Sequence, residues 1–333
     1  MTSYEIAKLA GVSRATVYRV LNHKPNVKDE VRLKVQAVID EYGYRPNVAG
    51  KALVKQRRQG VIGVLLPKIE SDFYMQVREG IDTAAAEYEG MGFEVGCLEM
   101  SGLTAEDELS AIAEMKKRRA DGIVLVGVDD EKVKDALRNF PGPVVTLLSD
   151  IRGTERICFV GNELVKSGRT AGQLMAMLLR PSAKIGIIAT GLGLQAHRDR
   201  IEGFRGYAAE NGLEVFGIYE NGDDDEKTYA AGKRILEERP DGIYMTTGLG
   251  TDGLERALRE CNQQGKVRVI LSDMGTSSVR MLVQGSADFI ICQEPYREGY
   301  LALKLLLDYL VKGEMPAQKE YLTKIEIITS ESI

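Results

Sequence analysis

The chain has few of the residues that build metal sites, disulfides and nucleophilic triads. Its 333 residues include no tryptophan, two histidines and four cysteines. His23 and His197 lie far apart in the sequence and offer little to a metal cluster or a histidine-based triad. The cysteines lack C-x-x-C spacing, which favours buried reduced thiols over a disulfide framework. We therefore expect no metal, no cofactor and no catalytic residues.

Long apolar runs are also missing. No stretch reaches the roughly 20 apolar residues that a membrane-spanning helix needs. The N-terminus lacks the basic and apolar regions of a secretory signal peptide. Together with reduced thiols, these features predict a cytoplasmic protein without a membrane partner.

Charge is distributed unevenly along the chain. Residues 1–60 contain twelve Lys or Arg and five Asp or Glu, a net charge of +7. The whole chain carries −5, so residues 61–333 carry −12. A basic head on an acidic body is typical of a protein that binds a nucleic-acid backbone at one end only.

The head shows the pattern of short helices joined by a sharp turn. Ile6, Leu9 and Ala10 fall on one face of a first helix. Gly11 suits the turn, and Ser13 is placed to cap a second helix that is apolar on one face and basic on the other. A third helix follows from about residue 28. This pattern predicts a DNA-reading helix-turn-helix, while the alternative is a three-helix bundle with a solvated basic face.

The stretch I-A-K-L-A-G-V-S-R-A-T-V-Y-R-V-L-N, followed by Y-R-P-N, resembles the headpiece of the lactose-repressor (LacI/GalR) family of transcription regulators. The resemblance implies base contacts in the major groove from Arg14, Ala15 and Arg19, and arginine suits bidentate contact with guanine. It also implies a hinge helix whose Leu53 enters the minor groove as an apolar wedge. The residues expected to contact DNA are Ser13, Arg14, Ala15, Thr16, Tyr18, Arg19, Asn22, Asn47 and Leu53.

The body has the pattern of an α/β protein with parallel sheets. Apolar runs that fit buried strands alternate with amphipathic helical stretches, which predicts helices on both sheet faces. The runs lie at 61–66, 93–98, 122–126, 144–148, 184–189, 214–219, 242–246, 267–271 and 288–292. Residues 61–333 are too many for one typical sheet domain, so we expect two lobes.

The resemblance makes this body similar to a periplasmic sugar-binding protein, with a ligand in the cleft between two lobes and three crossovers. The expected parts are a helix-turn-helix domain (1–45), a hinge (46–59) and the body (60–333). Crossovers expected near 161–163, 293–295 and 320–322 divide the body into about 60–161 with 294–320, and 162–293 with 321–333.

Candidate effector-binding residues follow predicted strands, where open α/β sheets bind ligands. Phe73 suits the apolar face of a sugar, and carboxylates, amides and an arginine suit vicinal hydroxyls. Arg200 in R-I-E-G-F and Asp273 match the family pattern, and we expect both to serve the ligand rather than the fold. The expected effector residues are Phe73, Asp150, Asn162, Arg200, Gly248, Asp273 and Gln293.

One motif favours a different class of protein. G-L-G-T-D-G at 248–253 follows an apolar run, and Asp273 lies twenty positions after Gly253. That spacing is typical of a dinucleotide-binding loop with its ribose-binding acid. The alternative is therefore a cytosolic enzyme that binds NAD or a sugar phosphate through this loop.

We conclude from the sequence that the protein is a ligand-responsive transcription regulator, expected to be a repressor. One helix-turn-helix reads a single half-site, so we expect a homodimer on a near-palindromic operator in double-stranded DNA. The effector is expected to be a sugar, a polyol or a sugar phosphate.

The charge asymmetry predicts DNA binding that depends steeply on salt and resides in residues 1–60. With roughly 6–8 phosphate contacts per dimer, affinity should fall by about three orders of magnitude between 50 and 200 mM salt. Fluorescence anisotropy on labelled operator measures this slope. Binding that does not respond to salt would contradict the assignment of the head.

Overall fold

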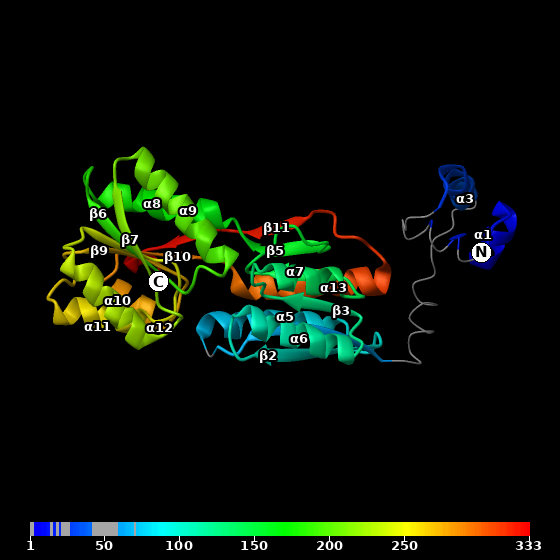
Figure 1. Cartoon of the computed structure of the whole chain (residues 1–333), viewed down its shortest axis with the longest axis horizontal. Coiled ribbons are helices and arrows are strands. Elements are labelled where there is room, and N and C mark those ends of the chain that lie inside the picture. The colour runs from blue at the N-terminus through cyan, green and yellow to red at the C-terminus, as the bar shows by residue number, and fades with distance from the viewer. Residues whose placement is uncertain (1–2, 14–15, 18–19, 21–26, 42–58, 70) are drawn as a thin grey trace. The chain divides into compact units, whose positions relative to one another are not determined.

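The computed structural model describes residues 3–13, 16–17, 20, 27–41, 59–69 and 71–333 (Figure 1). The chain divides into two compact units, Met1–Arg57 and Arg58–Ile333. The first is the head and the second is the body.

The head is helical around a small apolar core. Helix α1 (Ser3–Ala10) is followed by helical residues at 16–17 and 20 and by α3 (Asp29–Glu41). Gly11 adopts a φ of 63°, as the predicted turn requires. Leu9 is 50% exposed, so its predicted place on the inner face is wrong. Ala7 takes that place because it lies three residues before the buried Ala10, a spacing that puts both on one helical face. The core consists of Ile6, Ala7, Ala10, Val17, Val20, Val35 and Ile39.

The first lobe of the body is a parallel sheet covered by helices on both faces (Figure 1). Its order is β11-β5-β4-β3-β1-β2, and every neighbouring pair is parallel. The strands are β1 (Gly60–Pro67), β2 (Phe93–Met100), β3 (Gly122–Leu125), β4 (Val144–Leu147), β5 (Cys158–Asn162) and β11 (Glu320–Thr323). Helices α5 (Asp72–Glu87) and α13 (Pro295–Lys312) pack on one face, and α6 (Ala105–Lys117) and α7 (Glu131–Arg138) pack on the other.

The second lobe repeats this plan in the order β12-β10-β9-β8-β6-β7. Its strands are β6 (Lys184–Ala189), β7 (Glu214–Glu220), β8 (Gly242–Met245), β9 (Arg268–Ser272), β10 (Phe289–Cys292) and β12 (Glu326–Ile328). Helices α8 (Leu164–Leu178) and α9 (Gln195–Glu210) cover one face. Helices α10 (Asp225–Glu237), α11 (Thr251–Glu260) and α12 (Thr276–Val283) cover the other, and a short 3-10 turn (Ser330–Ser332) follows β12.

The predicted two-lobed α/β fold is confirmed, and two details differ. Strand β12 runs antiparallel to β10. Residues 320–322, expected at the third crossover, instead form β11, which pairs with β5 in the first lobe. The chain therefore crosses at Lys324 and Ile325, between β11 and β12. In the part of the chain that the structure describes, no helix is both long and apolar enough to cross a membrane.

A buried polar cluster joins the three segments that cross between the lobes. Asn162 at the first crossover donates from Nδ2 to the carbonyl of Lys324 at the third, at 2.8 Å. The hydroxyl of Thr323 lies 3.2 Å from the carbonyl of Gly161 and 2.5 Å from Oε1 of Glu298. The hydroxyl has one proton and two acceptors, so both contacts are hydrogen bonds only when Glu298 is protonated and donates to Thr323.

The surroundings of Glu298 favour that neutral form. The side chain is fully buried and its Oε2 has no hydrogen-bond partner in the described structure. Burial raises the pKa of Glu298 to about 8, against the weaker opposing effect of the Thr323 hydrogen bond. The hinge between the lobes therefore contains a carboxylic acid that is uncharged at neutral pH.

Glu298→Gln should remove a pH-dependent cost to stability. An unfolded chain releases the proton near pH 4.5 and the folded protein near pH 8, so stability falls as the pH rises through that window. We compare the free energy of unfolding of the variant with that of the parent at each pH. The difference should be roughly 3 kcal/mol more favourable to the variant at pH 7 than at pH 4. Urea unfolding across pH 4–9 measures this. The control is Glu314→Gln, at an exposed position just after α13, which should leave the pH dependence of the parent's stability unchanged. If the stabilities of Glu298→Gln and the parent change in parallel with pH, Glu298 is not the buried neutral acid.

Candidate functional site

A cavity of about 450 Å³ lies between the two lobes of the body. Loops that follow strands of both sheets line it, among them β1 and β4 of the first lobe and β6 to β10 of the second. Open α/β sheets place their ligand sites at these carboxyl ends of parallel strands. A ligand in this cavity contacts both lobes at once.

Two buried side chains, Arg200 and Asp273, and the half-buried Gln293 form one wall. Arg200 on α9 donates from Nη1 to the carbonyl of Thr246 at 2.7 Å and lies 3.5 Å from Oδ1 of Asp273 through Nη2. Gln293, directly after β10, donates from Nε2 to the same Oδ1 at 3.0 Å. Arg200 Nε and Gln293 Oε1 are buried without a hydrogen-bond partner in the described structure. Because unpaired buried polar atoms are costly, this wall carries an unfavourable contribution to the free energy of folding.

Asp273 carries its carboxylate on a strained backbone. Its φ of 62° lies in the left-handed region that side chains rarely adopt. Burial raises the pKa of Asp273, while Arg200 and Gln293 lower it by stabilising the charged form. Strain of this kind together with a desolvated carboxylate is typical of binding sites.

Arg200 and Asp273 also hold the fold together, which differs from the expectation that they serve the ligand alone. Both are buried, and each is the other's charge partner. Removal of Arg200 would leave a buried carboxylate unpaired, a change that costs several kcal/mol in typical proteins. Nearby His197 bonds through Nδ1 to the Thr246 hydroxyl at 2.9 Å, and burial lowers its pKa to about 3.

Asp223 lines the cavity and was missed by the sequence analysis. It follows β7 in the run E-N-G-D-D-D and, like Asp273, has a left-handed backbone, with φ of 60°. Its Oδ1 accepts hydrogen bonds from the hydroxyls of Thr190 (2.5 Å) and Thr247 (3.0 Å). Burial raises the pKa of Asp223, and the nearby Asp273 raises it further. An acidic run after a predicted strand was the available signal.

The first lobe contributes aromatic side chains at the start of α5. Ser71 caps this helix by accepting a hydrogen bond from the backbone N–H of Tyr74 at 3.2 Å. The cap fixes the first turn, and the rings of Phe73 and Tyr74 meet edge to face at 5.4 Å. Burial and the carboxylates of Asp223 and Asp273 raise the pKa of Tyr74, so its hydroxyl stays protonated.

The glycine-rich loop at 248–253 lines the cavity, but its geometry reflects helix packing. Gly250 caps α11 with a φ of 85°. A Cβ on Gly253 would lie 2.0 Å from the backbone oxygen of Asp225, which shows how closely α11 packs on α10. The backbone N–H of Gly253 already donates to the carboxylate of Asp225 at 3.1 Å. A dinucleotide phosphate would need such donors to be free.

Two predicted effector residues do not line the cavity. Asp150 instead makes a bidentate ion pair with Arg156, at 2.6 and 2.7 Å, and accepts from Thr146 at 2.7 Å. Asn162 is buried at the hinge. In both cases the protein itself provides the partner that a ligand was expected to provide: the Arg156 side chain for Asp150 and the Lys324 carbonyl for Asn162. Five predicted residues do line the cavity: Phe73, Arg200, Gly248, Asp273 and Gln293.

In the head, Ser13 and Thr16 are the predicted DNA-contacting residues that the structure describes. The Ser13 hydroxyl accepts from the backbone N–H of Thr16 at 3.1 Å, which is the predicted helix cap. The others lie outside the described residues: Arg14, Ala15, Tyr18, Arg19, Asn22, Asn47 and Leu53.

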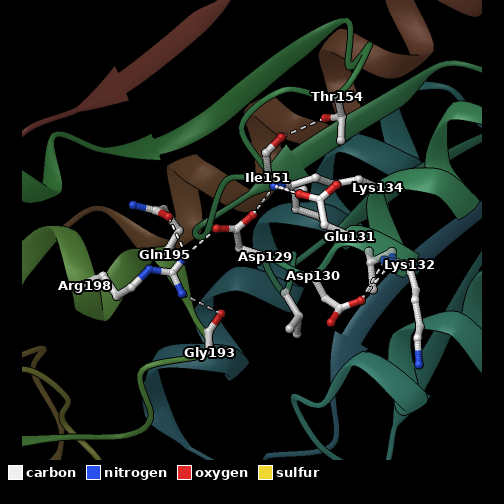
Figure 2. Close-up of polar contacts among 12 residues, drawn as sticks. Asp129, Asp130, Glu131, Lys132, Lys134, Ile151, Thr154, Gly193, Gln195 and Arg198 are labelled. Atoms are coloured by element: carbon white, nitrogen blue, oxygen red, sulfur yellow. Dashed lines mark hydrogen bonds and ion pairs between the residues drawn. The ribbon is translucent and has the colours of Figure 1, made fainter.

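Polar contacts bridge the lobes beside the cavity (Figure 2). Arg198 on α9 of the second lobe pairs with Asp129 of the first lobe at 2.5 Å. Lys134 on α7 holds the other oxygen of Asp129 at 2.8 Å, and Gln195 accepts from Arg198 (Figure 2). A second bridge joins Arg152 of the first lobe to Asp199 of the second at 2.8 Å. These contacts favour the closed arrangement of the lobes.

Two family matches cover the two units. Residues 62–315 match the periplasmic binding protein domain, and residues 2–47 match the bacterial regulatory proteins of the lacI family. A DNA-reading head joined to a ligand-binding body defines the class of ligand-responsive regulators. The chain belongs to the LacI family of bacterial regulatory proteins, with a periplasmic binding protein domain as its body.

Curated relatives extend over nearly the whole chain. Catabolite control protein A of Priestia megaterium is 29% identical over 328 residues, which cover 94% of this chain and 93% of the relative. Catabolite control protein A of Staphylococcus xylosus is 25% identical over 317 residues, with coverage of 93% and 92%.

Solved structures share the fold of the body. GanP, a glucose-galactose binding protein from Geobacillus stearothermophilus, has a TM-score of 0.76 at 22% identity and covers 83% of this chain and 99% of its own. An ABC-transporter solute-binding protein from Bacillus halodurans C-125 with bound myo-inositol has a TM-score of 0.74 at 21% identity, with coverage of 82% and 96%.

Family membership confirms the predicted class of function. The protein is a DNA-binding transcription regulator with a ligand-binding body, and the alternative of a nucleotide-dependent enzyme is excluded. Its partners are double-stranded DNA, a small-molecule effector and a second copy of the chain.

Arg198→Ala should shift the body toward an open arrangement by removing one bridge between the lobes. A partly exposed ion pair is worth about 1 kcal/mol, which changes the ratio of closed to open forms roughly fivefold. Small-angle X-ray scattering should show a larger radius of gyration. Arg169→Ala is the matched control, because Arg169 pairs with Glu210 inside the second lobe. Equal scattering from both variants would contradict a role for Asp129 and Arg198 in closure.

Proposed function

We propose that this protein is a repressor that binds a near-palindromic operator as a homodimer, and that a sugar or polyol held between the lobes changes its operator affinity. The proposed effector contacts are Phe73, Arg200, Gly248, Asp273 and Gln293 from the sequence analysis, with Asp223 added from the structure. The proposed DNA contacts remain Ser13, Arg14, Ala15, Thr16, Tyr18, Arg19, Asn22, Asn47 and Leu53. Since the head acts on DNA, we place the protein in the cytoplasm.

One observation carries the proposal for the effector. Arg200, Asp223, Asp273 and Gln293 bring both donors and acceptors to one cavity of about 450 Å³. A hydroxyl both donates and accepts, so a polyol suits a wall that offers both kinds of group. GanP, a glucose-galactose binding protein, and the solute-binding protein with bound myo-inositol share the fold and support the same class of ligand.

The switch follows from where the ligand lies. A ligand in the cavity touches both lobes, so it binds the closed arrangement more tightly than the open one. It can shift the equilibrium only by that difference in affinity. The bridges at Asp129 and Asp199 act on the same equilibrium.

Phe73→Ala tests the effector site without removing a buried charge. The ring borders the cavity, and its loss should weaken effector binding by roughly tenfold, as expected for about 1–2 kcal/mol of lost aromatic contact. Operator binding is titrated against a panel of pentoses, hexoses and polyols, and the concentration for half-maximal response is compared.

Met75→Ala is the matched control for this test. Met75 lies on the same helix, is 67% exposed and is not part of the cavity wall. This variant should respond at the parent's ligand concentration. If Phe73→Ala is folded by circular dichroism and responds at the parent's ligand concentration, the effector does not bind against Phe73 and the proposed site is wrong.

A further inference from the structure

The cavity between the lobes is strongly acidic. Six of its lining residues carry charge, five of them carboxylates and one a guanidinium: Asp72, Asp223, Asp225, Asp252, Asp273 and Arg200. His197 adds no positive charge at neutral pH, because burial holds its pKa near 3. A ligand that enters this cavity therefore meets an excess of negative charge.

Four of the five carboxylates have partners within the protein that offset their charge. Asp273 pairs with Arg200, and Asp252 pairs with Arg280. Asp72 and Asp225 bind backbone N–H groups at the starts of α12 and α11. Each is therefore stabilised by a cation or by a helix N-terminus.

Asp223 is the exception. Its Oδ1 accepts from two neutral hydroxyls, those of Thr190 and Thr247. Among the described residues, no Lys or Arg forms an ion pair with Asp223 and no hydrogen bond reaches its Oδ2. Burial and the neighbouring Asp273 raise the pKa of Asp223, so its negative charge is held against an unfavourable environment. A bound cation beside Oδ2 would remove that penalty.

Carboxylates of the protein already occupy part of the two helix N-termini at the cavity. At α12, the N–H of Thr276 donates to Asp72 at 3.1 Å and that of Gly275 donates to Ser278 at 2.9 Å. At α11, the N–H of Gly253 donates to Asp225 at 3.1 Å. A ligand phosphate would have to displace carboxylates of the protein to reach these donors. The same geometry that admits a cation thus disfavours a phosphate.

We propose that the effector is a polyol that carries an amino group, such as an amino sugar or aminocyclitol, and that Asp223 binds its ammonium group while phosphorylated sugars are rejected. The inference rests on the proposed function, since it specifies the ligand of the same cavity. Arg200, Asp273 and Gln293 bind the hydroxyls, and Asp223 distinguishes ligands by charge.

Isothermal titration calorimetry on the full-length protein tests this with matched ligands. Each set contains a hexose, its amino derivative, the N-acetylated amine, the O-methyl ether and the phosphate, on the glucose, galactose and mannose scaffolds. The N-acetyl and O-methyl members control for size without charge. On the scaffold that binds, the amine should bind at least about tenfold more tightly than the parent sugar, a difference of 1.4 kcal/mol. The phosphate should bind at least about tenfold more weakly.

Asp223→Asn removes the proposed recognition and keeps the shape of the side chain. The amine and the parent sugar should then bind with affinities within about threefold of each other. Asp224→Asn is the matched control: Asp224 is exposed, is not part of the cavity wall and caps α10, a position that asparagine also fills well. This variant removes the same charge one residue away and should keep the parent's preference for the amine.

The outcomes separate the two proposals. If the neutral sugar or the phosphate binds more tightly than the amine, the proposal that Asp223 binds an ammonium group is wrong. The proposal that a sugar binds in this cavity would then still hold. A preference for the amine that survives in Asp223→Asn would also overturn the proposal for Asp223. If no member of any set binds, the amino-polyol inference fails, and the operator titration with pentoses, hexoses and polyols decides whether the proposed effector class fails with it.

Discussion

The ion pair between Arg200 and Asp273 is the constraint on which the ligand-binding body depends. It joins α9 to the loop after β9, and Gln293 extends it to the second crossover between the lobes. Burying these groups is costly unless their hydrogen bonds are completed, and Arg200 Nε and Gln293 Oε1 are not completed by the protein. Arg200, Asp273 and Gln293 also line the cavity, so the same groups support the fold and face the candidate ligand site.

Closure and binding are linked because the cavity and the hinge share structural elements. Gln293 directly follows β10, the strand that precedes the second crossover, and Glu298 lies one helical turn into α13. Glu298, Thr323 and Asn162 form a hinge of neutral hydrogen bonds, whereas the bridges at Asp129 and Asp199 are ionic. Salt weakens exposed ion pairs more than buried neutral hydrogen bonds. The hinge therefore persists at salt concentrations that weaken the ion pairs of Asp129 and Asp199.

The head and the body carry net charges of opposite sign, and each sign suits the ligand of that part. The head carries the excess of positive charge that DNA requires, while the body is acidic and its cavity contains more carboxylates than cations. An acidic body is repelled by the phosphate backbone, which restricts DNA binding to the head. Inside the cavity the same sign of charge selects among ligands, because Asp223 has no cationic partner in the described structure.

The sequence by itself determined the class of the protein, because short-range patterns carry that information. Helix spacing and Gly11 predicted the head, and the alternation of apolar runs with helices predicted the two-lobed body. Asp273 and Gln293 were found because a residue after a parallel strand reaches the ligand-binding edge, and Arg200 was found because R-I-E-G-F resembles the family pattern. Tertiary structure decided which of these positions face the cavity. Asp150 pairs with Arg156, six residues further along the chain, and Asn162 bonds to the carbonyl of Lys324, 162 residues away. Asp223 follows β7, and its partners Thr190 and Thr247 follow β6 and β8 of the same sheet. Side-chain partners of this kind depend on contacts across the chain, which local pattern does not encode.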